Sequence, residues 1–153
     1  MRYTLLFTIA ILAFTACKKD KYTTAPQISY KSLSANLIDT NSLTTPYPSI
    51  TFSITDAEGD LGITANDTAF IYIKSLLTND FDSVRFPDLQ LAAKNNFKAD
   101  VSVVLPNAVV KCKPIPGGGW HTDQLFFEIY VKDFEKNKSN VITTPDPVYF
   151  ICR

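Results

Sequence analysis

Three acidic side chains alternate with other residues in one short stretch of the chain. Asp56, Glu58 and Asp60 stand at positions i, i+2 and i+4 around Gly59, directly after an alternating apolar segment. On a curved backbone, oxygen ligands at this spacing converge on one hard cation, and Ca²⁺ takes six to eight oxygens. Asp67 falls at the twelfth position of such a loop. The flanks are expected to be strands and the glycine is not at the sixth position, so the stretch is not an EF-hand.

A second acidic loop follows the most regular apolar segment of the chain. Asp133 comes directly after residues 125–132, at the start of the hydrophilic stretch 133–140. If residues 50–55 and 125–132 are strands B and F of an immunoglobulin sandwich, the loops after them emerge at the same end. The predicted Ca²⁺ ligands are therefore Asp56, Glu58, Asp60, Asp67 and Asp133. The alternative is that these side chains only cap backbone groups in two hydrophilic turns.

The same carboxylates permit a hydrolase in which Asp56, Glu58 or Asp60 act as acid and base. We expect them to be exposed on a turn, where nothing raises a carboxyl pKa, and we therefore predict that the protein is not an enzyme. Gly-x-Ser-x-Gly, His-Glu-x-x-His and phosphate-binding loop motifs do not occur in the sequence. The single histidine, His121, has no second histidine or plausible cysteine ligand beside it, so we expect no metal role for it.

Two cysteines and a tryptophan are further candidate functional residues in the C-terminal part of the chain. Cys112 and Cys152 form a disulfide if neighbouring strands bring them together, and otherwise remain two buried free thiols. Trp120 follows three glycines in the stretch 114–121. It either covers the edge of the fold or forms a contact surface for a sugar or a protein.

The elements that must position these residues are strands. The chain has 153 residues, of which 46% are hydrophobic and 20% charged, which predicts one globular domain with a packed core. From residue 27 onward, apolar residues recur with period two; the clearest case is Leu125, Phe127, Ile129 and Val131. About seven such strands predict an all-β fold, an immunoglobulin-like two-sheet antiparallel β-sandwich spanning residues 27–153.

The N-terminal residues read as an export signal. A short basic start is followed by an apolar run over residues 4–14, which is too short to span a bilayer, and then by Thr15, Ala16 and Cys17. The segment 14–17 resembles the lipobox of bacterial lipoprotein precursors, which implies a signal peptide over residues 1–16 and a lipid on Cys17. Residues 17–26 are then a lipidated tether. The alternative is an ordinary secretory signal with Cys17 near the cleavage site.

Together with the lipobox, the stretches 55–62 and 133–143 resemble those of small Bacteroidota-type lipoproteins with an immunoglobulin-like or cadherin-like sandwich. Such proteins tend to carry an Asp-Gly-Asp-Gly-Asp-Leu-Gly-like loop after an early strand and an Asp-Arg-Ala-Gly-Asn-like loop before the last strand. Ala57 and Glu58 depart from the first pattern. The resemblance implies a fold and an outer-membrane location, and little about activity.

Charge excludes one class of partner. Lys plus Arg and Asp plus Glu are both 15, so the chain has no excess charge that would attract nucleic acid. We expect a lipid-anchored, non-catalytic module of the cell envelope, stabilised by Ca²⁺ and acting in adhesion or in carbohydrate or protein recognition. The alternative is a structural envelope lipoprotein without a ligand.

Overall fold

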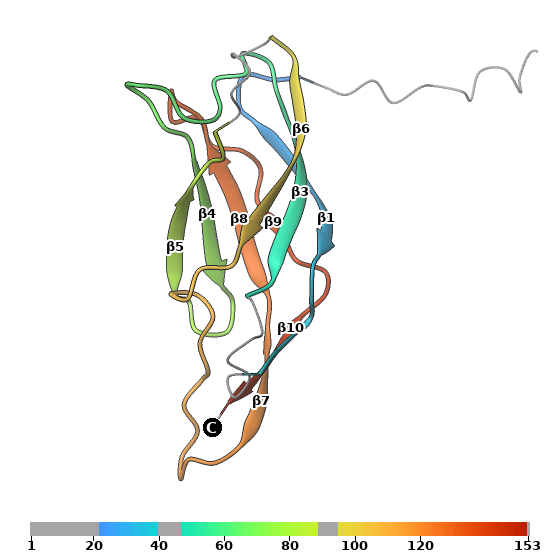
Figure 1. The fold of residues 1–153 in the computed structure, drawn as a ribbon, viewed down its shortest axis with the longest axis vertical. Helices are drawn as coiled ribbons and strands as arrows, with labels where there is room; N and C mark the ends of the chain where they lie inside the picture. Colours follow the sequence, from blue (N-terminus) through green and yellow to red (C-terminus); the bar gives the residue numbers. More distant parts are fainter. Residues whose placement is uncertain (1–21, 40–46, 89–94, 153) are drawn as a thin grey trace, which may run out of the picture.

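The computed structural model describes residues 22–39, 47–88 and 95–152 (Figure 1). Within these ranges the chain contains strands and no helix, so the all-β prediction is confirmed. The strands are β1 (Gln27–Leu33), β2 (Leu37–Asp39), β3 (Ser49–Asp56), β4 (Phe70–Ser75), β5 (Phe81–Arg85), β6 (Phe97–Val104), β7 (His121–Leu125), β8 (Phe127–Lys132), β9 (Ile142–Thr143) and β10 (Val148–Cys152).

The strands form three sheets, ordered β1-β3-β6, β5-β4-β8-β9 and β2-β10-β7. All neighbouring strands are antiparallel except β10 and β2, which are parallel. Only Phe126 separates β7 from β8, so the second and third sheets are joined by one long ribbon (Figure 1). This arrangement is consistent with a β-sandwich.

Alternation along each strand decides which side chains form the core. Ile50, Phe52 and Ile54 on β3 are completely buried, and the residues between them are only partly buried. On β8, Phe127 and Ile129 are also completely buried, as the period-two pattern predicted. Burying each such side chain contributes roughly 1.5–3 kcal/mol, so these faces hold the layers together.

Ten strands were found where about seven were predicted, and the extra ones are short or polar. β2 and β9 contain three and two residues, below the length at which a period can be recognised in sequence. β7 alternates, but with His, Thr, Asp and Gln, so its sequence lacks an apolar stripe. Its partner β10 keeps it in the sheet through paired backbone groups.

Asn140 links β1 to the segment between β8 and β9. Its side-chain Oδ1 accepts a hydrogen bond from Ile28 N at 2.7 Å, and its Nδ2 donates to Ile28 O at 2.9 Å. The amide thereby replaces a neighbouring strand for one residue of β1.

We expect Asn140→Ala to lower the free energy of unfolding by about 2 kcal/mol, because two backbone groups lose their partner. Urea denaturation measures the effect, and exposed Asn107→Ala, the control, should change stability by less than about 0.5 kcal/mol.

The predicted signal peptide (1–16) and residues 17–21 of the predicted tether, Cys17 included, lie outside the described residues. Across residues 22–39, 47–88 and 95–152, no helix has the length and apolar character needed to cross a bilayer. Within the tether, Thr23 is fixed to the domain, because its carbonyl accepts a hydrogen bond from Ala57 N at 3.1 Å. The described chain therefore begins beside the first acidic loop.

Candidate functional site

Three carboxylates converge where β3 and β8 end. Asp56 is the last residue of β3, Asp60 follows in the loop after it, and Asp133 comes directly after β8. One side-chain oxygen from each lies within 4.8 Å of the other two. Asp56 and Asp133 are completely buried, and Asp60 is partly buried. Residues far apart in the sequence thus form one acidic cluster, which we call the acidic site (Asp56, Asp60 and Asp133).

Local turns hold each of these carboxylates. Asp56 Oδ2 accepts a hydrogen bond from Gly59 N at 2.6 Å, and Gly59 has a φ of 68°, a left-handed conformation that glycine adopts without strain. Asp133 Oδ1 accepts from Asn137 N at 2.8 Å. Phe134 N donates to the backbone oxygen of Asp60 at 3.1 Å and so joins the two loops directly. Backbone N–H groups in the loops after β3 and β8 therefore hold the acidic site in place.

Each carboxylate also has one oxygen that the fold leaves unsatisfied. Asp56 Oδ1, Asp60 Oδ1 and Asp133 Oδ2 are buried and have no hydrogen-bond partner in the described part of the chain. None of the three residues forms an ion pair with a lysine or arginine among residues 22–39, 47–88 and 95–152. A buried carboxylate oxygen without a partner is costly, and three such atoms at one place fit a bound cation. The hard oxygen donors suit Ca²⁺ rather than a soft metal.

Burial and mutual repulsion alter the ionisation of the site. Burial raises the pKa of Asp56 to about 7; the Gly59 hydrogen bond opposes this increase, and the nearby Asp60 and Glu58 add to it. Burial also raises the pKa of Asp133, against the hydrogen bonds from Asn137. The expectation that Asp56, Glu58 and Asp60 are exposed on a turn is wrong for Asp56, because the end of β3 packs inside the domain.

Two of the predicted ligands do not join the site. Glu58 and Asp67 are exposed and lie outside the cluster. Asp67 belongs to a separate turn in which its backbone N and O bond to Thr64. Of the five predicted ligands, the structure brings together Asp56, Asp60 and Asp133.

Without a cation, the acidic site should make stability depend on pH. Asp56 ionises near 3.8 in the unfolded chain and near 7 in the folded protein. Between these pH values the native state binds more protons than the unfolded state, so the free energy of unfolding should fall as pH rises from about 4 to about 7. Above that range this contribution is constant. Urea denaturation in chelator at several pH values measures the decrease, and Asp56→Asn should largely remove it. An unchanged decrease in the variant would contradict the assignment.

The other end of the molecule carries the loop with Trp120. The connection from β6 to β7 forms a long excursion beyond the strands, at the end opposite the start of the described chain (Figure 1). Trp120 is 65% exposed and Ile115 is 40% exposed. Gly117, Gly118 and Gly119 all have positive φ, and a Cβ at any of them would meet no atom within 4 Å. These glycines therefore serve the path of the backbone, and about two thirds of Trp120 is exposed.

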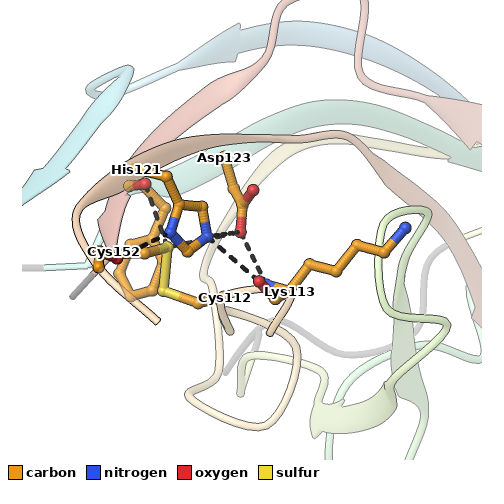
Figure 2. The surroundings of a disulfide bond; sticks show 7 residues. Cys112, Lys113, His121, Asp123 and Cys152 are labelled. Carbon is orange, nitrogen blue, oxygen red and sulfur yellow. Dashed lines mark hydrogen bonds and ion pairs between the residues drawn. A yellow bond between two sulfur atoms is a disulfide. The ribbon is translucent and has the colours of Figure 1, made fainter. Parts of the chain in front are cut away.

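A disulfide between Cys112 and Cys152 closes the base of this loop, which we call the distal loop (residues 113–121) (Figure 2). Asp123 Oδ2 accepts a hydrogen bond from Lys113 N at 2.7 Å, and His121 Nε2 lies 3.1 Å from Lys113 O. His121 Nε2 also lies 3.4 Å from Asp123 Oδ2. This group of side chains was not predicted from the sequence. The available signal was the His-x-Asp spacing, which puts two side chains on one face of a strand.

Aromatic side chains cover part of the outer face of β4 and β8. Tyr72 and Tyr130 stack with centroids 4.7 Å apart, Phe81 stacks on Tyr72, and Lys138 Nζ lies 4.1 Å from the Tyr130 centroid. The ring faces are thus occupied by one another and by a lysine. This arrangement stabilises the sheet.

The fold and the two ends define a class: an all-β domain with an acidic cluster between two loops at one end and a disulfide-closed aromatic loop at the other. Comparison with known proteins adds no identity, since no family model, curated protein or solved structure matches the chain.

Proposed function

We propose that this chain is a lipid-anchored, non-catalytic recognition module of the bacterial outer membrane. Its domain would be an immunoglobulin-like sandwich stabilised by Ca²⁺ at the acidic site, and its distal loop would contact a glycan or a protein. The observation that carries the proposal is the placement of two unlike sites at opposite ends of one rigid fold. The start of the described chain lies at the acidic end, and the exposed Trp120 lies at the other.

The strand order supports the finer fold assignment. Sheet β1-β3-β6 corresponds to strands A, B and E of an immunoglobulin domain, and β5-β4-β8 corresponds to C′, C and F. In that scheme the loops after B and F share one end, where Asp60 and Asp133 lie. β10 would be strand G, with β2 beside it as a short parallel edge strand.

The lipid on Cys17 sets the orientation in this proposal. Nine residues between Cys17 and Gln27 would reach about 30 Å at most, and Thr23 is already fixed to the domain, so the free tether is shorter and the acidic end would stay near the membrane. The distal loop would then point away from it. A loop carried on a rigid scaffold is a common place for binding residues, and Trp supplies a large contact area.

Two measurements test the proposal. Growth with a labelled fatty acid should label the protein, and Cys17→Ala should lose both the label and the membrane fraction; retained label in the variant contradicts the anchor.

A glycan array and cross-linking on intact cells should show a partner that Trp120→Ala loses at least tenfold. Phe81→Ala, an exposed aromatic on β5, is the matched control and should keep the partner. Equal binding by both variants would contradict the role of the distal loop.

A further inference from the structure

The disulfide lies among side chains that ligate transition metals (Figure 2). Cys152 pairs directly with His121 in the β10–β7 register, and side chains of directly opposed residues share a face. Asp123 lies two residues after His121 and therefore on the same face. The ligand atoms of Cys112, Cys152 and Asp123 lie within 4.8 Å of one another. His121 Nε2 and Cys152 Sγ each lie 3.4 Å from Asp123 Oδ2.

The surroundings already orient the two non-sulfur groups. His121 Nδ1 lies 3.3 Å from the backbone oxygen of Gly119. His121 Nε2 lies 3.1 Å from Lys113 O, so the ring must leave this carbonyl before Nε2 can bind a metal. The contact of Nδ1 with Gly119 O can then serve as the usual outer hydrogen bond of a ligating histidine. Asp123 Oδ2 is fixed by Lys113 N at 2.7 Å. These contacts come from β7 and from the loop base, so the geometry does not depend on a flexible surface side chain.

We propose that reduction of the Cys112–Cys152 disulfide converts this group into a Zn²⁺ site with Cys112, Cys152, His121 and Asp123 as ligands. An external dithiol supplies two electrons and two protons, the S–S bond breaks, and the dithiol becomes a disulfide. Zn²⁺ then displaces one proton from each new thiol and binds two thiolates, one imidazole nitrogen and one carboxylate oxygen. This is a four-coordinate set of the kind that zinc favours.

The two redox states differ in what they can bind. With the disulfide intact, both sulfurs are bonded to each other and no thiolate exists. Cys112 is partly buried and Cys152 is almost completely buried, so a reductant reaches the sulfur of Cys112 first. The soft sulfur donors separate this group from the acidic site, where hard oxygens select Ca²⁺. The inference rests on the disulfide cluster and is independent of the lipid anchor and of any partner of the distal loop.

Cobalt(II) provides the direct test, because it substitutes for zinc and reports thiolate ligation in its absorption spectrum. The mature protein is reduced with a water-soluble phosphine, transferred to buffer with excess Ca²⁺ to occupy the acidic site, and titrated with Co²⁺. We expect one Co²⁺ per chain with thiolate-to-metal charge-transfer bands, displaced by Zn²⁺. The oxidised protein should show no such bands.

Variants separate this site from unspecific binding by free thiols. His121→Gln and Asp123→Asn should each weaken Zn²⁺ binding by the reduced protein at least roughly tenfold, while Asp80→Asn should leave it unchanged. If reduction loosens the fold, Zn²⁺ should restore the β-sheet circular dichroism of the wild type. Three results would each overturn the proposal: no charge-transfer bands, wild-type zinc affinity in both ligand variants, or no recovery of a lost circular-dichroism signal.

Discussion

Saturating Ca²⁺ should raise the melting temperature of the domain by roughly 8 °C. A ligand that binds only the folded state at 100 times its Kd adds about 2.7 kcal/mol, and one kcal/mol corresponds to about 3 °C for a domain of this size. The physical source is the three buried carboxylate oxygens that the fold leaves without partners. Calorimetric scans with Ca²⁺ and with chelator measure the shift, and isothermal titration measures the stoichiometry, which should be one.

Removing one carboxylate should stabilise the Ca²⁺-free protein and abolish the additional stabilisation by Ca²⁺. Asp133→Asn keeps an acceptor for Asn137 N but removes a charge from a buried, repulsive cluster. We expect the variant to be more stable than wild type by about 1 kcal/mol in chelator at pH 8, and to lose the Ca²⁺-dependent increase.

The matched controls are the two predicted ligands that lie outside the cluster. Glu58→Gln and Asp67→Asn remove exposed carboxylates from the same loop and should keep the full response to Ca²⁺. A wild-type protein whose melting temperature and heat of titration ignore Ca²⁺ would refute the site. Loss of the response in Glu58→Gln would refute the assignment of Asp56, Asp60 and Asp133 as the ligands.

Loss of the disulfide should be the largest single destabilisation. Cys112 and Cys152 are separated by 40 positions, and the chain-entropy model gives about 4 kcal/mol for closing a loop of this length. The double variant Cys112→Ser, Cys152→Ser, measured in chelator, should therefore melt roughly 10–15 °C below wild type. Urea denaturation should show the same free-energy loss.

Reduced wild type in chelator is the internal comparison for this variant, because it lacks the same cross-link without a change of sequence. The two should agree within about 1 kcal/mol. A double variant as stable as the oxidised wild type would show that the bond constrains nothing that the strands do not already constrain.

The apolar strands could be predicted from the sequence because one physical rule governs them. Phe127, Ile129 and Val131 alternate with polar residues, and only one face of a pleated strand can be buried. β7 escaped prediction because its side chains are polar on both faces. Its place depends on hydrogen bonding to β10, and that pairing leaves no trace in local composition.

Part of the acidic site could also be predicted from the sequence. Asp56 and Asp60 follow from their spacing, and Asp133 follows from an assumed strand order that places two loops at one end. Glu58 shares the spacing of Asp56 and Asp60 but lies outside the cluster, because spacing alone does not show which side chains of a turn converge. The proximity of His121 to the cysteines requires the exact register of β10 against β7, which alternation alone cannot supply.

The disulfide also determines how a pulling force would pass through the molecule. A force applied at Trp120 enters β7 through the chain and β10 through the Cys112–Cys152 bond, so it loads two hydrogen-bonded strands at once. Because the described chain begins at the far end of the fold, the load runs lengthwise along the ribbon of β7 and β8. Both strands are then pulled from the same end, so the hydrogen bonds between them carry little of the load, whereas without the disulfide the force would enter β7 alone and shear it against β10.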